Sequence, residues 1–147
     1  MRKIFIACPY VKCFVGGAFS DFQLKEFLEE LFCICQEYSD EVFMALKAEE
    51  YGLSPRENYK CSMDLEEICS SDVVIAIPDD SMGVAVELGW ASAMGKRIIS
   101  VMDKTKTYSP LIRNINTIVE GEPVWYEKDI MNTLSLIRES LKKYNQE

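Results

Sequence analysis

The sequence predicts an α/β domain built on a doubly wound, parallel sheet of five strands with helices on both faces. Short apolar runs rich in β-branched residues alternate along the chain with longer segments of helical periodicity. This alternation is typical of parallel strands joined by right-handed crossovers. With 147 residues and 48% hydrophobic content, the chain can form one ordinary core but is too short for two. We therefore expect residues 1–147 to form a single domain.

The sequence predicts five strands, at residues 3–8, 42–46, 73–77, 97–102 and 122–126. The runs at 3–8, 73–77 and 97–102 fit strands that are buried on both faces of a sheet. One predicted helix begins at Ser20 or Asp21, a second covers residues 57–70, and a third follows Ser81. Two more cover residues 111–116 and 128–144. Residues 47–56 and 103–110 are expected to be loops. The expected strand order is the flavodoxin-like or Rossmann-like order 2-1-3-4-5.

The predicted strand order also predicts where a ligand site lies on the sheet. Open α/β sheets bind ligands beyond the carboxyl ends of their strands, where the winding direction reverses. This point lies between the first and third strands, so the loops at residues 9–18 and 78–83 meet there. The residues expected in this pocket are Tyr10, Gly16, Gly17, Ser81 and the start of the helix that contains Glu87.

These residues also have plainer interpretations. The glycine pair allows a phosphate or sugar to approach the backbone closely, but it could also form a simple turn. Tyr10 could contact a ligand or only cover the edge of the sheet. Ser81 can cap the next helix, Gly83 permits close approach, and the free N–H groups of the first turn can hold an anion. Capping alone is the commonest role of a serine at such a position.

Glu87 is the clearest candidate for a functional group. Its neighbours in the helix are nearly all apolar: Val84, Ala85, Val86, Leu88, Trp90, Ala91 and Met94. A buried carboxylate without a partner is costly, so the position favours a functional role over a structural one. Asp64 differs, because it lies in a predicted helix beside Glu66 and Glu67. That pattern alone favours a residue that faces solvent.

Charge and composition exclude several classes of function. The net charge of −8 and the pI of about 4.7 argue against nucleic-acid polymers and anionic membranes as partners. A small anion remains compatible, since backbone N–H groups and hydroxyls can hold one phosphate. The chain has no histidine. Ser–His–Asp triads, Cys–His pairs and histidine metal sites are therefore excluded, and carboxylates must carry any acid–base chemistry.

The cysteines indicate a reducing compartment. The six cysteines contain no CxxC pair, and the sequence begins without the apolar region of a signal peptide. No apolar run approaches the ~20 residues that span a bilayer. We expect a soluble, cytoplasmic protein with reduced and mostly buried thiols.

Five segments form a more specific combination. They are DLEEI at residues 64–68, SDVVIA at 71–76, SMGV at 81–84, ELG at 87–89 and GK at 95–96. Together they resemble the nucleoside 2-deoxyribosyltransferase superfamily, and within it the nucleoside 5′-monophosphate N-glycosidases. The resemblance covers residues 63–113 well and the first strand with its glycine loop loosely.

The resemblance implies roles for individual residues. Glu87 matches the family's nucleophile, Asp64 the helix acid that handles the base, and Ser81 the serine that binds phosphate. The deoxyribosyltransferases tend to carry an aspartate in place of this serine, so Ser81 implies a 5′-phosphorylated substrate. Ser109, in the segment YSPLIR at residues 108–113, is similar to a serine that a neighbouring subunit supplies, which implies a homodimer. The loop CPYVKCFVGGAF is longer and more hydrophobic than its counterpart, so no base or sugar preference is inferred.

The expected activity is hydrolysis of a nucleoside 5′-monophosphate to free base and (deoxy)ribose 5-phosphate. Glu87 would form a covalent glycosyl intermediate, and Asp64 would protonate the departing base. No cofactor or metal is expected. Three alternatives are a transferase that passes the sugar to a second base, a non-catalytic nucleotide-binding or TIR-like signalling module, and a flavodoxin-like domain of unrelated role.

Overall fold

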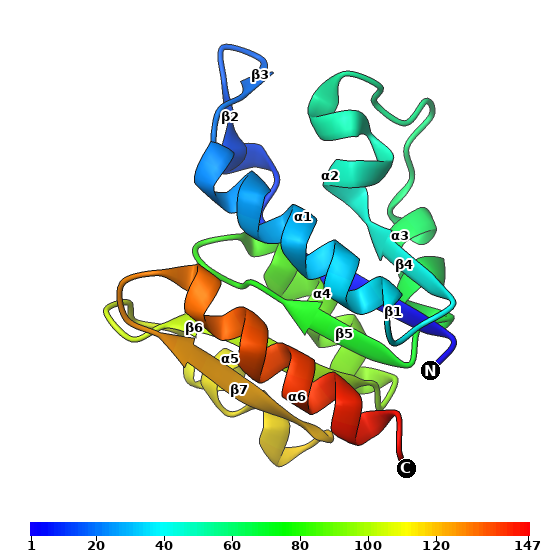
Figure 1. Ribbon diagram of the computed structural model, residues 1–147. Helices are drawn as coiled ribbons and strands as arrows, with labels where there is room; N and C mark the ends of the chain where they lie inside the picture. The colour runs from blue at the N-terminus through cyan, green and yellow to red at the C-terminus, as the bar shows by residue number, and fades with distance from the viewer.

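A parallel sheet of five strands forms the centre of the structure, a computed structural model that describes residues 1–147. The strands are β1 (Lys3–Ala7), β4 (Glu41–Met44), β5 (Val73–Ala76), β6 (Arg97–Asp103) and β7 (Gly121–Tyr126). Their order is β4-β1-β5-β6-β7, and every neighbouring pair is parallel (Figure 1). This is the predicted order 2-1-3-4-5, so the predicted fold is confirmed.

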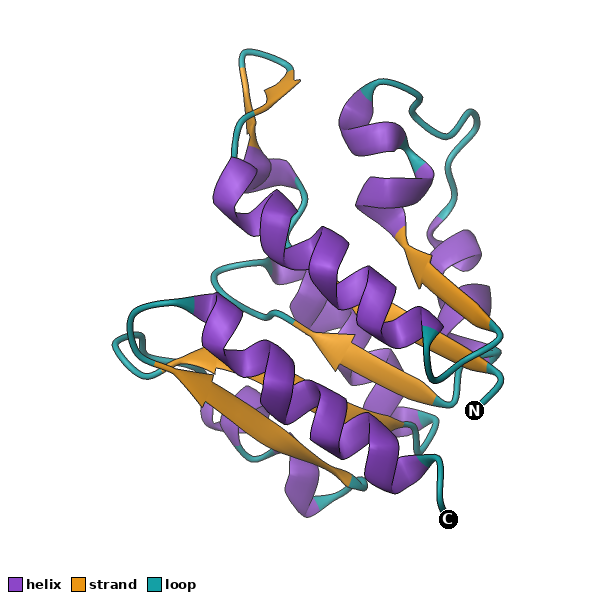
Figure 2. Ribbon diagram, in the orientation of Figure 1, coloured by secondary structure: helices purple, strands orange, loops and turns teal.

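Helices cover both faces of the sheet (Figures 1 and 2). One face carries α1 and α6, which lie side by side, and the other carries α3, α4 and the short α5. The bounds of these helices are Phe22–Gln36 for α1, Leu134–Tyr144 for α6, Cys61–Cys69 for α3, Met82–Ala93 for α4 and Pro110–Arg113 for α5. None of the helices combines the length and the apolar composition that crossing a bilayer requires.

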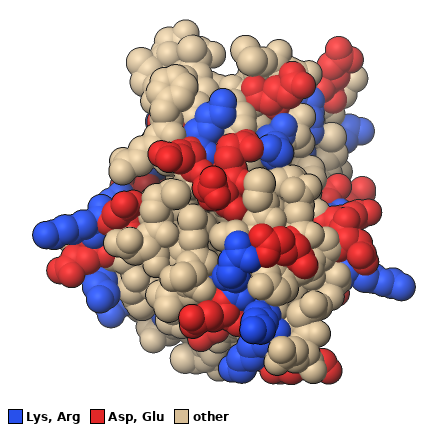
Figure 3. All heavy atoms as spheres, in the orientation of Figure 1, with Lys and Arg blue, Asp and Glu red and all other residues tan.

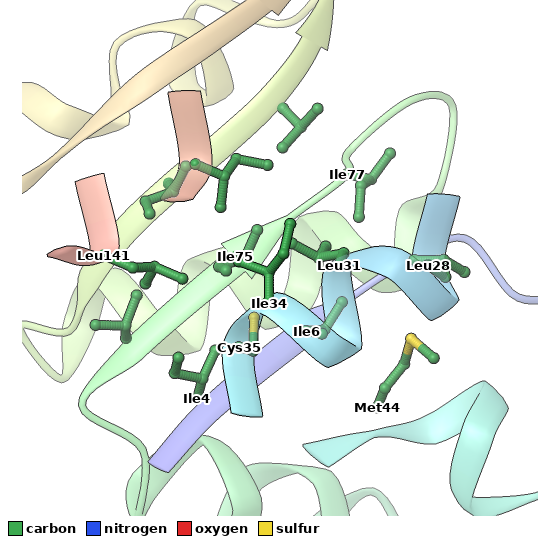
Figure 4. Packing of buried hydrophobic residues seen from close by; sticks show 14 of the residues in the cluster. Ile4, Ile6, Leu28, Leu31, Ile34, Cys35, Met44, Ile75, Ile77 and Leu141 are labelled. Carbon is green, nitrogen blue, oxygen red and sulfur yellow. The ribbon is translucent and has the colours of Figure 1, made fainter. Parts of the chain in front are cut away.

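The central strands are buried on both sides, which explains their continuous apolar runs. Successive residues of a strand point to opposite faces. Ile4 and Ile6 of β1 therefore join the larger core cluster beneath α1 and α6 (Figure 4), while Phe5 and Ala7 join the smaller cluster beneath α3 and α4.

Two connections at the carboxyl end of the sheet differ from the prediction. Residues 9–18 were expected to be an irregular loop, but they contain η1 (Val11–Cys13) and most of a small antiparallel hairpin formed by β2 (Phe14–Val15) and β3 (Ala18–Phe19). The second strand was expected to reach residue 46. It ends at Met44 because the chain turns there into α2 (Ala45–Ala48), which η2 follows.

Aromatic contacts hold the hairpin against η2 (Glu50–Gly52). The ring of Phe14 lies 5.0 Å from that of Tyr10 and 5.6 Å from that of Phe19. Phe19 in turn meets the ring of Tyr51 edge-on, at 5.0 Å. Such ring pairs stabilise a fold by more than the burial of their surface area alone. They link two segments that no strand pairing connects.

Two other predicted helices differ in their extent. The helix predicted over residues 57–70 begins only at Cys61, because Asn58 adopts a left-handed backbone with φ of 51° that cannot continue a helix. The last helix is divided into η4 (Ile130–Thr133) and α6. The predicted short helix at residues 111–116 is α5 followed by η3 (Ile115–Thr117).

Acidic and basic side chains are intermixed on the face seen in Figure 3, and no continuous basic area covers it. That distribution agrees with the acidic composition of the chain.

Gly121 provides a test of the strand pairing between β6 and β7. It pairs with Ile98, has φ of 120°, and a Cβ added there would lie 1.9 Å from the Ile98 carbonyl oxygen. Gly121→Ala should therefore lower the free energy of unfolding by at least about 2 kcal/mol. The matched control is Gly89→Ala in α4, where an added Cβ meets nothing within 4 Å; it should leave stability equal or raise it by up to ~1 kcal/mol. Urea unfolding measures both, and equal stability of the two variants would contradict the pairing.

Candidate active site

Two adjoining cavities lie at the carboxyl end of β1, where the winding of the sheet reverses. The first, of about 350 Å³, we call the α3 cavity because Asp64 of α3 lines it. The second, of about 380 Å³, we call the α4 cavity because the start of α4 lines it. Cys8, Tyr10 and Glu87 line both cavities, so the two meet at these three residues.

Glu87 lies on the second turn of α4 and is half-buried. Its carboxylate has no ion-pair partner, because the arginine that lines the same cavity pairs with other carboxylates. Burial, and after it the negative charge of Asp64, raise the pKa of Glu87 to about 8, although the charge of Arg56 opposes the rise. Glu87 is therefore largely protonated at neutral pH in the ligand-free protein.

Asp64 is buried at the far side of the α3 cavity. The expectation from its acidic neighbours, that it faces solvent, is wrong. Its side chain points inward because two donors hold it: Tyr59 Oη donates to Oδ2 at 2.5 Å, and Arg56 Nη1 donates to Oδ1 at 2.9 Å. The two helix carboxylates at these cavities thus have different surroundings, since Asp64 is paired and Glu87 is not.

Arg56 organises the α3 cavity and was missed by the sequence analysis. Besides Asp64, Arg56 contacts the buried Glu49. The Arg56 Nε lies 3.6 Å from Glu49 Oε2, and the Arg56 backbone N–H donates a hydrogen bond to Glu49 Oε1 at 3.1 Å. Its guanidinium also lies 4.7 Å from the ring centre of Tyr59. Arg56, Tyr59 and Glu49 occupy irregular segments that no periodicity marks. The only available signal was their place between a strand and the following helix, at the edge where ligands bind.

The start of α4 forms the wall of the second cavity. Ser81 caps the helix, and its Oγ accepts a hydrogen bond from the backbone N–H of Val84 at 3.2 Å. No acceptor in the protein takes the hydrogen of this hydroxyl. Gly83 is exposed, and the only atom near an added Cβ would be the Ser81 Oγ at 3.8 Å. The wall therefore offers a hydroxyl and free N–H groups to an anion.

The structure brings together five of the eight residues that the sequence analysis selected. Glu87, Asp64, Tyr10, Ser81 and Gly83 all line one or both cavities.

The other three selected residues line neither cavity. Gly16 and Gly17 form the turn of the hairpin, with φ of 59° and 82°, which is the plainer of their two interpretations. Ser109 is exposed and caps α5 by accepting a hydrogen bond from the Leu111 N–H. No group of three or more cysteine, aspartate and glutamate side chains is arranged to hold a metal ion.

Cys8 was not selected but lines both cavities. Burial, and then the negative charge of Glu87, raise the pKa of its thiol above the ordinary range. The thiol therefore stays protonated and acts here as a small apolar wall.

Comparison with known proteins identifies the family. Residues 13–141 match the family model described as nucleoside 2-deoxyribosyltransferase. The chain belongs to this family. No curated protein matches the sequence.

Two solved structures are similar over nearly the whole chain. The solution structure of BlsM has 30% sequence identity and a TM-score of 0.76, covering 97% of this chain and 90% of that one. The CMP N-glycosidase BcmB of Clostridium botulinum has 26% identity and a TM-score of 0.61, covering 98% and 99%. Family membership and this neighbour support a glycosyl-transfer or glycosidic-cleavage activity.

The raised pKa of Glu87 makes a testable contribution to stability. The folded protein holds the proton of Glu87 up to about pH 8, whereas the ordinary value of 4.5 applies once the chain unfolds. Between pH 4.5 and 8 the unfolded chain has lost this proton while the folded protein still binds it. The contribution of Glu87 to the free energy of unfolding therefore falls as the pH rises from 4.5 to 8. Glu87→Gln should match the wild type near pH 4.5 and exceed its free energy of unfolding by about 2–4 kcal/mol above pH 8. Urea unfolding at several pH values measures this difference. The exposed Glu66→Gln should show no such trend, and a flat difference for Glu87→Gln would contradict the buried, unpaired state.

Proposed function

We propose that this protein hydrolyses the N-glycosidic bond of a nucleoside 5′-monophosphate, releasing the base and (deoxy)ribose 5-phosphate. The observation that carries this proposal is that Glu87 lines both cavities. The anomeric carbon of a nucleotide lies between its base and its phosphate. A ligand with its base in the α3 cavity and its phosphate at the start of α4 presents that carbon to Glu87.

The first step forms a covalent intermediate. A carboxylate oxygen of Glu87 attacks the anomeric carbon, the N-glycosidic bond breaks, and its electron pair goes to the base nitrogen. Bases leave poorly as anions, so Asp64 delivers a proton to the base as the bond breaks. Retaining glycosidases use two carboxylates in the same way.

The proton must be on the correct carboxylate before this step. The ligand-free protein holds it on Glu87, the nucleophile, while Asp64 is bonded to Arg56 and Tyr59. The reactive form has the same number of protons but carries this one on Asp64. We propose that the bound base draws the proton to its own side of the site, and that the positive charge of Arg56 stabilises the Glu87 carboxylate that remains.

The second step regenerates the enzyme. Water loses a proton to Asp64 and attacks the anomeric carbon of the glycosyl ester, which frees the Glu87 carboxylate and the sugar phosphate. In methanol–water mixtures the same intermediate should yield a methyl glycoside with the configuration of the substrate, as two displacements require.

The test is base release from ribo- and deoxyribonucleoside 5′-monophosphates, followed by chromatography. Wild-type protein should release a free base from at least one member of the panel. Glu87→Ala should reduce the rate at least about 10³-fold, because it removes the attacking atom. The matched control is Glu66→Ala, on the exposed face of α3, which should keep the wild-type rate. The proposal fails if no nucleotide yields a base or if Glu87→Ala is fully active.

Transfer is the second candidate, because the matching family is named for it. A transferase would pass the sugar from Glu87 to a second base in place of water. Incubation of the active nucleotide with a different free base decides between the two. A new nucleotide indicates transfer, and sugar phosphate as the only product indicates hydrolysis.

We further propose that the protein acts as a homodimer in which Ser109 serves the neighbouring site. Ser109 is exposed and lines neither cavity of its own chain, so it is free to reach the site of a second copy. Exposed apolar side chains near it in sequence, Leu111 and Ile118, offer an area that a partner can cover.

Mixing two impaired variants tests this arrangement. Glu87→Ala and Ser109→Ala should each be weak alone, but a heterodimer restores one site with both Glu87 and a partner's Ser109. Random exchange of subunits should therefore recover activity in about a quarter of the sites, measured as base release after mixing. Light scattering gives the oligomeric state. A monomer, or a mixture no more active than its parts, would contradict the proposal.

A further inference from the structure

Glu49 lines the α3 cavity as a buried carboxylate, 8% exposed, that has no role in the proposed reaction. One of its oxygens, Oε1, accepts the hydrogen bond from the Arg56 backbone N–H. The other, Oε2, accepts none, because the Nε of Arg56 lies 3.6 Å away, which is too far for a hydrogen bond. Since a buried carboxylate oxygen needs a donor, Oε2 is an open acceptor at this wall.

The backbone directly after Glu49 is strained. Glu50, Tyr51 and Gly52 all have left-handed φ values, of 49°, 54° and 90°. Such conformations are unfavourable for residues other than glycine and persist only where contacts enforce them. Tyr51 supplies one such contact, because its Oη donates to Glu29 Oε1 at 2.6 Å. Strain of this kind is concentrated at active sites and ligand-binding segments, and here it fixes the place of a buried carboxylate.

Arg56 presents open donors beside this acceptor. Its Nη1 donates to Asp64, but its Nε is buried without a hydrogen-bond partner, and the hydrogens of Nη2 have no acceptor in the protein. The guanidinium is held against two aromatic rings, 4.7 Å from the ring centre of Tyr59 and 5.8 Å from that of Phe43. The wall of the α3 cavity thus combines an open acceptor with open donors in fixed positions.

The rest of the cavity suits the flat ring of a base. Phe5, Ile6 and Ala45 supply apolar walls. Burial, and after it the negative charge of Glu49, raise the pKa of Tyr10, so the Tyr10 side chain also lies near this carboxylate. One guanidinium serves two carboxylates, Glu49 and Asp64, and a wall with this balance attracts ligands that bring N–H groups of their own.

The bases differ in whether they match this pair of groups. Cytosine carries an amino group next to the unprotonated ring nitrogen N3, and adenine carries one next to N1. Uracil and hypoxanthine carry a carbonyl oxygen and a protonated ring nitrogen at the same two places. Those atoms would set an oxygen against the Glu49 carboxylate and an N–H against the Arg56 guanidinium. A site whose buried polar groups are left unpaired rejects such a ligand strongly.

We propose that Glu49 and Arg56 together select the base of the substrate. Glu49 Oε2 accepts a hydrogen from an exocyclic amino group, and Arg56 donates to the adjacent ring nitrogen. The substrate class is then the 5′-monophosphates of amino bases, cytosine or adenine, and not those of uracil or hypoxanthine. This inference rests on the proposed function and names the class of base that it releases. Asp64, bound to Nη1 of the same guanidinium, keeps its role as the acid.

Glu50 provides a matched control. It is the next residue of the same turn, but it is exposed and lines neither cavity. Loss of an acidic charge in this turn would affect Glu49→Gln and Glu50→Gln alike, whereas base recognition predicts an effect of Glu49→Gln alone.

The experiment measures kcat/KM for base release from two pairs of nucleotides. Cytidine 5′-monophosphate is compared with uridine 5′-monophosphate, and adenosine 5′-monophosphate with inosine 5′-monophosphate. Within the pair that the wild type accepts, the amino member should be preferred at least about 100-fold. Glu49→Gln should reduce this ratio below about tenfold, with a slower amino member and a faster oxo member, because an amide can also donate to a carbonyl oxygen. Glu50→Gln should keep the wild-type ratio.

Two further measurements support the same decision. The dimethylamino analogue of the accepted nucleotide has no amino hydrogen, so the wild type should reject it as strongly as the oxo member, whether or not Glu49→Gln folds. Glu87→Gln lacks the nucleophile, and isothermal titration calorimetry on it gives Kd without turnover. The amino member should bind at least about tenfold more tightly than the oxo member, and adding Glu49→Gln should remove most of this difference.

The outcomes separate this inference from the proposed function. It is overturned if the wild type accepts amino and oxo members equally, if the dimethylamino analogue reacts as well as its parent, or if Glu49→Gln slows both members alike. It stands without the proposed function if no nucleotide yields a base but the amino members bind more tightly and this preference depends on Glu49. Both are lost if the protein neither releases a base nor binds any of the four nucleotides.

Discussion

Arg56 is the cation on which the α3 cavity depends. It lies against two buried carboxylates, Glu49 and Asp64, which come from different segments of the chain. Either carboxylate without this partner would carry the large penalty of a buried, unpaired charge. The same contacts fix the course of residues 53–60, which have no regular secondary structure. One guanidinium thus both balances the charge of the cavity and shapes its wall.

The position of Arg56 also gives the helix carboxylates distinct properties. Asp64 is bonded to the arginine and to Tyr59, and Glu87 is left without a cation. Two carboxyl groups with different surroundings can exchange one proton and serve as nucleophile and acid. The chain is strongly acidic, but each of the two cavities is lined by one cation. Arg56 lines the α3 cavity next to Asp64, and Lys12 lines the α4 cavity with the start of α4. An unpaired carboxylate lies between them.

The sequence predicted the centre of the sheet well because β1, β5 and β6 are buried along nearly their whole length, and a parallel strand buried on both faces requires an apolar run. Ser81 and Glu87 were identified because each departs from the regular element around it. Arg56, Tyr59 and Lys12 could not be found in this way, since they lie in segments whose path depends on tertiary contacts. The sequence pattern around Asp64 predicted a residue facing solvent, and this prediction is wrong for a related reason. The burial of Asp64 is due to partners in the preceding irregular segment, and no helical periodicity records them.

The hairpin of β2 and β3 pairs with no strand of the central sheet. A ribbon of two residues per strand is marginal by itself, and aromatic contacts to η2 hold it beside the cavities. Its length and sequence can therefore vary without disturbing the register of the strands that place Glu87. No residue of the ribbon lines either cavity, so it is a surface appendage that can be lengthened, shortened or exchanged while the walls of the site stay in place.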